Sequence, residues 1–183
     1  MTIVELCSIA AGLFSAAVSL WYIWSVLHGG RPKWVTWFIW GTLDLIILAG
    51  MWRGGHVTNW QIISCSVFAW VTFILALKFG VPGWNRVDKA CLIGAAVSIV
   101  LLWHYPAWAL AMSLLATCVA AMPTYVSAWE DPTRENFAAW MLGVIPGALI
   151  LCIVPWTFAA AAQPATFLVV NGTVPLIILV RRR

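Results

Sequence analysis

The sequence predicts an all-α integral membrane protein, with seven transmembrane helices in a single domain over residues 1–183. Three observations lead to this fold class. The chain is 63% hydrophobic and only 9% charged, whereas soluble domains carry about 25% charged residues. Its mean hydropathy is +0.96. Short turns rich in glycine, proline and charge divide it into apolar segments near the roughly 20 residues that cross a bilayer.

The clearest segment is Arg31–Arg53, which reads RPKWVTWFIWGTLDLIILAGMWR. Its apolar part, Trp34–Trp52, has basic residues and tryptophans at both ends, as suits the two membrane–water interfaces. One acid, Asp44, lies near its middle, where a carboxylate costs about 2.5–3.5 kcal/mol on insertion scales. Such a residue usually faces protein or water rather than lipid, so Asp44 is the first candidate functional residue.

The remaining segments are separated by turn signals. The first, residues 3–28, ends at a glycine pair and lacks the basic start of a signal peptide, so we expect it to be a mature helix. The others are residues 57–78, 87–104, 107–128, 136–160 and 163–180. Their short connections leave no room for a soluble domain.

The basic residues predict the orientation of the chain, because cytoplasmic loops of membrane proteins are enriched in lysine and arginine. With seven helices, nine of the ten basic residues share the side of the C-terminus, and Arg53 alone lies on the other. The nine are Arg31, Lys33, Lys78, Arg86, Lys89, Arg134, Arg181, Arg182 and Arg183. We therefore expect a multi-pass protein of the plasma (inner) membrane with its N-terminus outside and its C-terminus in the cytoplasm. The dispersed charge predicts no nucleic-acid partner.

Cofactor and enzyme chemistry find little support in the sequence. The five cysteines are scattered through apolar segments without a CxxC pair, which argues against a disulfide framework or a zinc site. The histidines fall at segment ends rather than facing each other within helices, as a membrane haem would require. No nucleophile, base and orienting group recur at one depth. We expect no catalytic residue, no metal and no cofactor.

Two stretches of the chain resemble each other in sequence. Residues 31–37 lead through a proline and a tryptophan to Gly41, and residues 131–140 lead through a proline and Trp140 to Gly143. The positions predict two three-helix units, about 3–79 and about 107–180, joined by a linker helix at about 87–104. Because one linker helix preserves direction, the two units would form a 3+1+3 parallel repeat.

This layout resembles the SWEET and PQ-loop transporter superfamily, and the resemblance extends over the whole chain. The superfamily's Pro-Gln signature is absent; the fifth segment offers Met122-Pro123-Thr124 instead. Asn171, in FLVVNGTVPLI, resembles the pocket asparagine of the sugar transporters in this family, while Ser64-Cys65-Ser66 stands where the other asparagine would be. The resemblance implies a transporter with its solute site between the two units.

The candidate site residues follow from their spacing along the helices and from the free-energy cost of placing polar groups in a membrane. Trp37 and Trp40 share a helix face with Asp44, which could carry a coupling proton, bind a cation with help from the indoles, or bond a neighbouring helix. Asn171 could contact substrate or form an interhelical hydrogen bond. Pro146 and Pro175 could act as hinges or mark close packing.

We therefore expect a small membrane transporter that moves a small polar or cationic solute through a midplane site, with proton coupling at Asp44. Its partners would be the lipid bilayer, a small-molecule substrate, and a second copy of the chain or a larger membrane complex. One alternative is a non-catalytic structural or accessory subunit of such a complex. Another is a protein that binds a lipid or pigment among its tryptophans.

Overall fold

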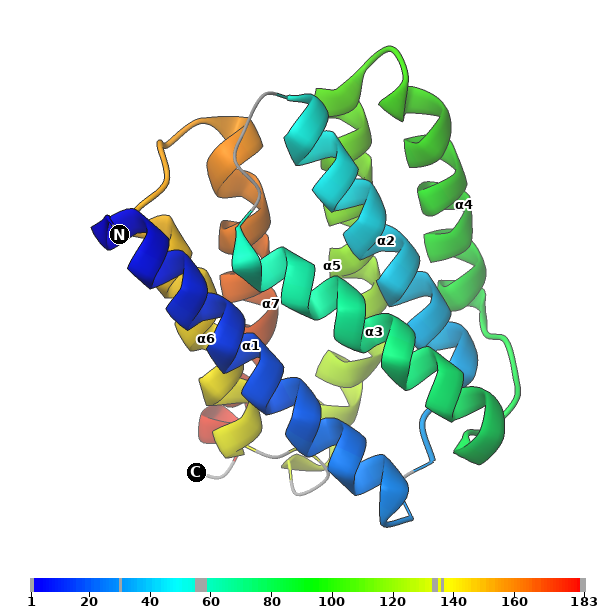
Figure 1. Ribbon diagram of the computed structural model, residues 1–183. Coiled ribbons are helices and arrows are strands. Elements are labelled where there is room, and N and C mark those ends of the chain that lie inside the picture. Colours follow the sequence, from blue (N-terminus) through cyan, green and yellow to red (C-terminus); the bar gives the residue numbers. More distant parts are fainter. Residues whose placement is uncertain (1, 30, 55–58, 133–134, 136, 182–183) are drawn as a thin grey trace.

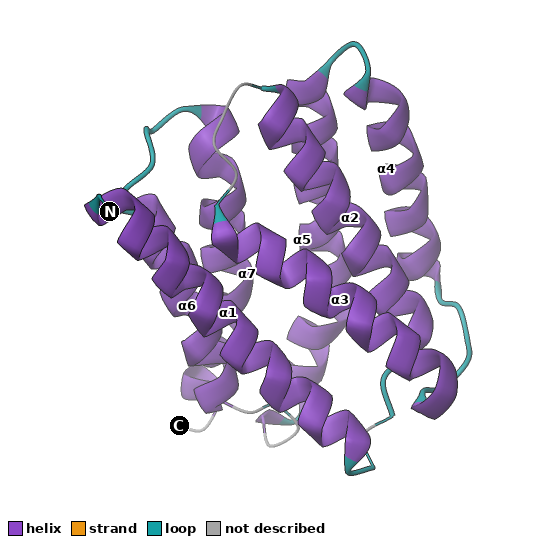
Figure 2. Cartoon of the chain, viewed as in Figure 1, coloured by secondary structure: helices purple, strands orange, loops and turns teal. Residues whose placement is uncertain are grey.

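The computed structural model describes residues 2–29, 31–54, 59–132, 135 and 137–181, and over these residues the chain is all-helical (Figures 1 and 2). The helices are α1 (Ile3–Leu27), α2 (Trp34–Arg53), α3 (Trp60–Phe79), α4 (Arg86–Leu102), α5 (Pro106–Glu130), α6 (Phe137–Leu151) and α7 (Phe158–Arg181). Within the described residues the only extended pairing is an isolated bridge between Lys33 and Val81. The predicted all-α class is confirmed.

Five of these helices, α1, α2, α3, α5 and α7, are long and apolar enough to cross a membrane. The other two are shorter, with 17 residues in α4 and 15 in α6. By length and composition the chain is thus a multi-pass membrane protein. Successive helices run in alternating directions, and the N- and C-termini lie at opposite ends of the bundle (Figure 1).

Local sequence signals fix several helix starts. Thr2 and Glu5 form a capping box on α1, in which the Glu5 N–H donates to Thr2 and the Thr2 N–H donates to Glu5. Asn85 and Asp88 form the same device on α4. The side chain of Asn59 accepts from the N–H of Ile62 and so caps α3.

The connection between α6 and α7 differs from the expected boundaries. The sequence predicted segments at 136–160 and 163–180, but α6 ends at Leu151 and α7 begins at Phe158. Pro155 therefore lies in the connection and not inside a helix. Proline has no N–H to donate and clashes with the preceding turn, and the chain turns at Ile153 and Val154, whose N–H groups both donate to Ile150. Pro164 and Pro175 instead lie inside α7.

Helix α2 is the central element. It packs against α3, α4 and α5, with a smaller contact to α7. Half of its most apolar stretch is buried, against 11% of the corresponding stretch of α1, and the main helix contacts of α1 are with α3 and α6.

The ends of the bundle are held by different contacts. At the end where α2 and α4 begin, the Lys33 ammonium pairs with the Asp88 carboxylate, and the Val81 N–H donates to the Pro32 carbonyl at 3.0 Å. This end carries most of the described basic residues and is called the basic end below. At the opposite end, called the outer end after the orientation predicted from the sequence, the Arg53 guanidinium lies over the Trp103 ring and donates to the Trp103 carbonyl.

Candidate functional site

Helix α2 presents two contrasting faces, since residues spaced by three and four along a helix lie on one side. Its packed face consists of Val35, Ile39, Leu43 and Ile46. These side chains form one apolar cluster with Cys91 and Ala95 of α4 and Ala116 of α5. The tryptophan face of α2 consists of Trp37, Trp40 and Asp44, and it is the candidate functional site.

Asp44 lies inside the bundle, with 3% of its surface exposed. Its position midway along α2 puts it about 15 Å from either end of the helix, at a rise of 1.5 Å per residue. Its Oδ1 atom meets no hydrogen-bond partner among the described residues. The carboxyl acts electrostatically on the Cys65 thiol of α3, and Ser15 of α1 lies beside the same thiol. Asp44 thus faces the space enclosed by α1, α2 and α3.

The two tryptophans lie toward the basic end from Asp44, and both are half-buried. Trp37 packs on Tyr22 of α1, with ring centroids 4.8 Å apart. Glu135, in the connection before α6, acts electrostatically on Tyr22 and accepts a 2.8 Å hydrogen bond from the Trp140 indole. Aromatic side chains and a carboxylate from three parts of the chain therefore gather between Asp44 and the basic end.

A further aromatic contact borders the tryptophan face. The Trp70 indole of α3 lies against Gly41, so closely that a Cβ added to this glycine would meet Nε1 at 3.0 Å. The Trp70 Nε1 atom is buried and meets no hydrogen-bond partner among the described residues. Trp21 and Trp24 of α1, in contrast, have more than half of their surface exposed, so they do not wall an internal site.

Asn171 lies on a different side of the bundle. Its Nδ2 atom donates to the Phe167 carbonyl of its own helix at 2.7 Å, and its Oδ1 faces α6 at Gly143, where an added Cβ would come within 2.7 Å. The described residues show no hydrogen bond between Asn171 and Asp44. Pro146 and Pro175 are both buried inside their helices. The predicted site residues therefore form one group around Asp44 and a second around Asn171.

Several polar residues of this region were not singled out from the sequence. Gln61 and Gln163 are 1% and 0% exposed, and Asn59 donates to the Gln163 side chain at 3.0 Å. At the sequence level both glutamines stand at the beginnings of apolar segments, where a solvated position is the ordinary expectation. Their only signal in the sequence is an uncharged amide near the beginning of an apolar segment, and the structure brings the beginnings of these two helices together.

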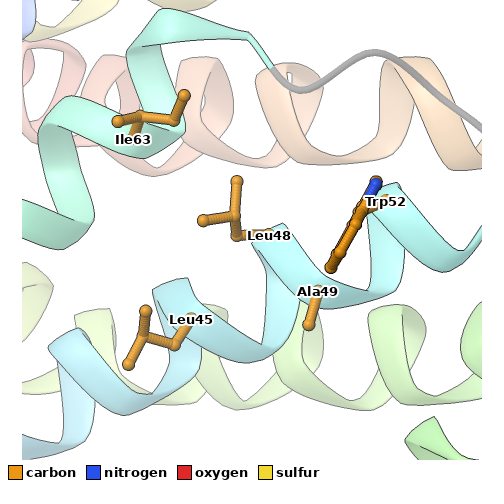
Figure 3. Close-up of a pocket in the computed structure, with 5 residues that line it drawn as sticks. All are labelled: Leu45, Leu48, Ala49, Trp52 and Ile63. Atoms are coloured by element: carbon orange, nitrogen blue, oxygen red, sulfur yellow. The ribbon is translucent and has the colours of Figure 1, made fainter.

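An apolar hollow of about 370 Å³ lies between α2 and the beginning of α3 (Figure 3). It is lined by Leu45, Leu48, Ala49, Trp52 and Ile63. Its lining carries no charged side chain, and Asp44 is not part of it. An open apolar hollow on the helices of a membrane protein suits a lipid chain better than a polar solute.

Comparison of the chain with protein-family models, with curated proteins and with solved structures finds no match.

Proposed function

We propose that the chain is a small membrane transporter that moves a small polar or cationic solute, with Asp44 carrying a coupling proton. The observation that supports this proposal is the buried, unpaired Oδ1 of Asp44 midway along a membrane-length helix. A carboxyl at such a depth is costly, and intramembrane acids of this kind mark ion and proton pathways. Trp37 and Trp40 on the same face would wall the solute and stabilise a cation through their rings.

The position of Asp44 argues against the main alternative. An accessory subunit would be expected to use its intramembrane acid at the contact with its partner. Asp44 is instead enclosed by helices of its own chain, so another chain could reach it only after the bundle opens. A carboxyl that faces the interior of one chain is better suited to a path through that chain.

The packing order of the helices supports the 3+1+3 parallel repeat. In the first proposed unit α3 contacts both α1 and α2, and in the second α7 contacts both α5 and α6. Between the units, α2 contacts α5 and α1 contacts α6, which is the crosswise pattern that a two-fold relation would produce. Gly41 accommodates Trp70 of α3, and Gly143 likewise accommodates Asn171 of α7. This repetition also favours a common origin with the SWEET and PQ-loop layout.

In this proposal all seven helices cross the plasma membrane, the N-terminus is outside and the basic end is cytoplasmic. The solute would pass near the midplane between the two units, with Asp44 on one side and Asn171 on the other. Pro146 and Pro175 remove backbone hydrogen bonds inside α6 and α7. They would let the second unit bend as the two halves rock about the site.

The direct test is proton movement in liposomes that contain the purified chain and a pH-sensitive dye. A monosaccharide, a zwitterionic amino acid and a small organic cation are added in turn. One of them should acidify the liposome interior with the native chain, and Asp44→Asn should abolish the signal because it removes the proton acceptor at nearly constant volume. Glu5→Gln is the matched control: it also removes one carboxylate, and glutamine keeps the capping box.

Equal purification yields of the two variants would separate a functional loss from a folding defect. The proposal is contradicted if Asp44→Asn and Glu5→Gln behave alike. Native mass spectrometry after gentle extraction gives an independent check, because stoichiometric co-extraction with other subunits would favour an accessory role.

A further inference from the structure

The interior of the bundle contains several polar side-chain atoms that no other described group satisfies. Among the described residues the buried, unpartnered atoms are Asp44 Oδ1, Gln61 Oε1, Ser64 Oγ, Trp70 Nε1 and Gln163 Nε2. Buried polar groups are normally paired, either with protein or with ordered water. A bound water needs two to four polar partners. This set offers both donors and acceptors.

Two of these residues, Gln61 and Ser64, lie in a row with Cys65 on α3. Gln61, Ser64 and Cys65 are spaced by three and four, so they share one side of α3, and side chains at this spacing are about 5–6 Å apart at their Cβ atoms. Gln61 stands in the first turn, at the outer end, and Cys65 lies one turn deeper, where the Asp44 carboxyl acts electrostatically on its thiol. The row thus leads from the outer end of α3 to the acid of α2.

A hydrogen-bonded pair of amide side chains lies at the outer end of this row. Asn59 and Gln163 are 5% and 0% exposed and are joined by a 3.0 Å hydrogen bond from Asn59 Nδ2 to Gln163 Oε1. This bond connects the beginning of α3 with the first turns of α7. The pair leaves the Gln163 Nε2 donor unused, while the Gln61 Oε1 acceptor one turn away from Cys65 is also unused. A water molecule bound between them would accept from Gln163 Nε2 and donate to Gln61 Oε1.

We propose that a file of bound water molecules connects the outer end with Asp44 along Gln61, Ser64 and Cys65 of α3. The amide pair of Asn59 and Gln163 closes the outer end to solutes, while the file still admits protons. A proton from outer water passes along the hydrogen bonds of the file to the Asp44 carboxylate. Each water of the file accepts a proton on one side and releases one on the other, so O–H bonds form and break in turn, and the net change is one proton lost by outer water and one gained by Asp44. The Asp44 carboxyl acts electrostatically on Cys65, which is the titratable side chain of this row.

This inference rests on the proposed role of Asp44 in proton coupling, and it adds the route and the side of entry. It also gives the buried amides a function. A transporter that is closed to solute on the outer side still needs a way for the outer proton to reach its acid, and a narrow polar file provides one without an open passage.

The Cys65 thiol is a built-in reporter, because it carries one exchangeable proton beside the file. Infrared spectroscopy follows its S–H to S–D exchange after transfer to D₂O, in a chain whose other four cysteines are replaced by alanine. The reference is a chain that keeps only Cys91, which is 1% exposed and packed in the apolar cluster of α2, α4 and α5. Cys65 should exchange at least about tenfold faster than Cys91, since water reaches Cys91 only when the packing opens.

Gln61→Leu tests the route, because leucine is close to glutamine in size but offers water no partner. It should slow the exchange of Cys65 by about tenfold and leave that of Cys91 unchanged. Ser66→Ala is the matched control: Ser66 is also a buried polar residue of α3, but it does not belong to the row. Gln61→Met serves as a second apolar variant if the leucine chain does not fold.

The water file is overturned if Cys65 exchanges no faster than Cys91, or if Gln61→Leu and Ser66→Ala slow Cys65 equally. These outcomes are distinct from failure of the proposed function, because the exchange requires no solute. A chain with the expected exchange that moves no solute would contradict transport alone. A chain that couples solute to protons but exchanges independently of Gln61 would contradict the file alone.

Discussion

The two faces of α2 come from the same apolar segment, but they have different surroundings in the bundle. On the packed face, Val35, Ile39 and Leu43 fit against α4 and α5 with almost no exposed surface. On the tryptophan face, Asp44 keeps an unpaired oxygen and its neighbours Trp37 and Trp40 are only half-buried. A helix held firmly on one side can keep a costly, incompletely satisfied group on the other. The packed face supplies rigidity, and we propose that the tryptophan face supplies the chemistry.

The largest effect expected from this contrast is a gain of stability at the tryptophan face. Asp44→Leu removes a carboxyl that costs about 2.5–3.5 kcal/mol at the centre of a membrane helix and fills the same site with an apolar side chain. We expect the thermal unfolding temperature in detergent to rise while uptake is lost, because function is commonly retained at the expense of stability. If Asp44→Leu instead lowers the unfolding temperature, the acid is a structural partner and the contrast between the faces fails.

The packed face should respond in the opposite direction. Leu43 is adjacent to Asp44 in sequence but is 1% exposed and packed among apolar side chains. Leu43→Ala should cost about 2 kcal/mol, near the low end for a buried leucine, because helices in lipid are held by packing and not by transfer from water. Chemical unfolding in mixed micelles measures this loss. Solute affinity should change little in the chain that remains folded, and a large change in affinity would extend the site to both faces.

The sequence predicted the helices of the molecule better than the surroundings of the candidate site. Hydropathy and length placed the helices because crossing a bilayer requires a long apolar run, and Asp44 stood out because it interrupts one. The boundary between α6 and α7 was missed because the region from Leu151 to Phe158 is apolar throughout, so hydropathy does not distinguish a turn at Pro155 from a kinked helix.

The polar surroundings of Asp44 were not predictable in the same way. Gln61 and Gln163 are 102 residues apart in the chain and would each suit a solvated helix start. Their burial depends on how α3 and α7 meet, which is a property of packing and not of either segment. The pairing of Asn171 with Gly143 has the same origin: each residue was singled out from its own helix, and only the bundle brings them together.

The smallest expected effect is a difference in stability between alanine substitutions at two glycines of α2 that have different neighbours. A Cβ at Gly50 would meet Leu110 of α5 at 3.5 Å, which is ordinary contact, whereas a Cβ at Gly41 would meet the Trp70 ring at 3.0–3.2 Å. Gly50→Ala should therefore stabilise the helix by about 0.5–1 kcal/mol, since alanine is the better helix former. Gly41→Ala gains the same propensity but forces the indole to shift, which offsets the gain at a cost of about 1–3 kcal/mol.

Tryptophan fluorescence distinguishes the two outcomes, because the emission of Trp70 should move in Gly41→Ala and not in Gly50→Ala, with Trp70→Phe chains used to isolate its contribution. The shift matters for function as well as stability. Trp70 of α3 packs against Gly41, which lies within one helical turn of Asp44 along α2. A displaced indole therefore changes the wall of the site and should weaken solute uptake. Equal emission and equal uptake in the two glycine variants would mean that the tryptophan face tolerates substitution as readily as the packed face, and the division of α2 into two tasks would not hold.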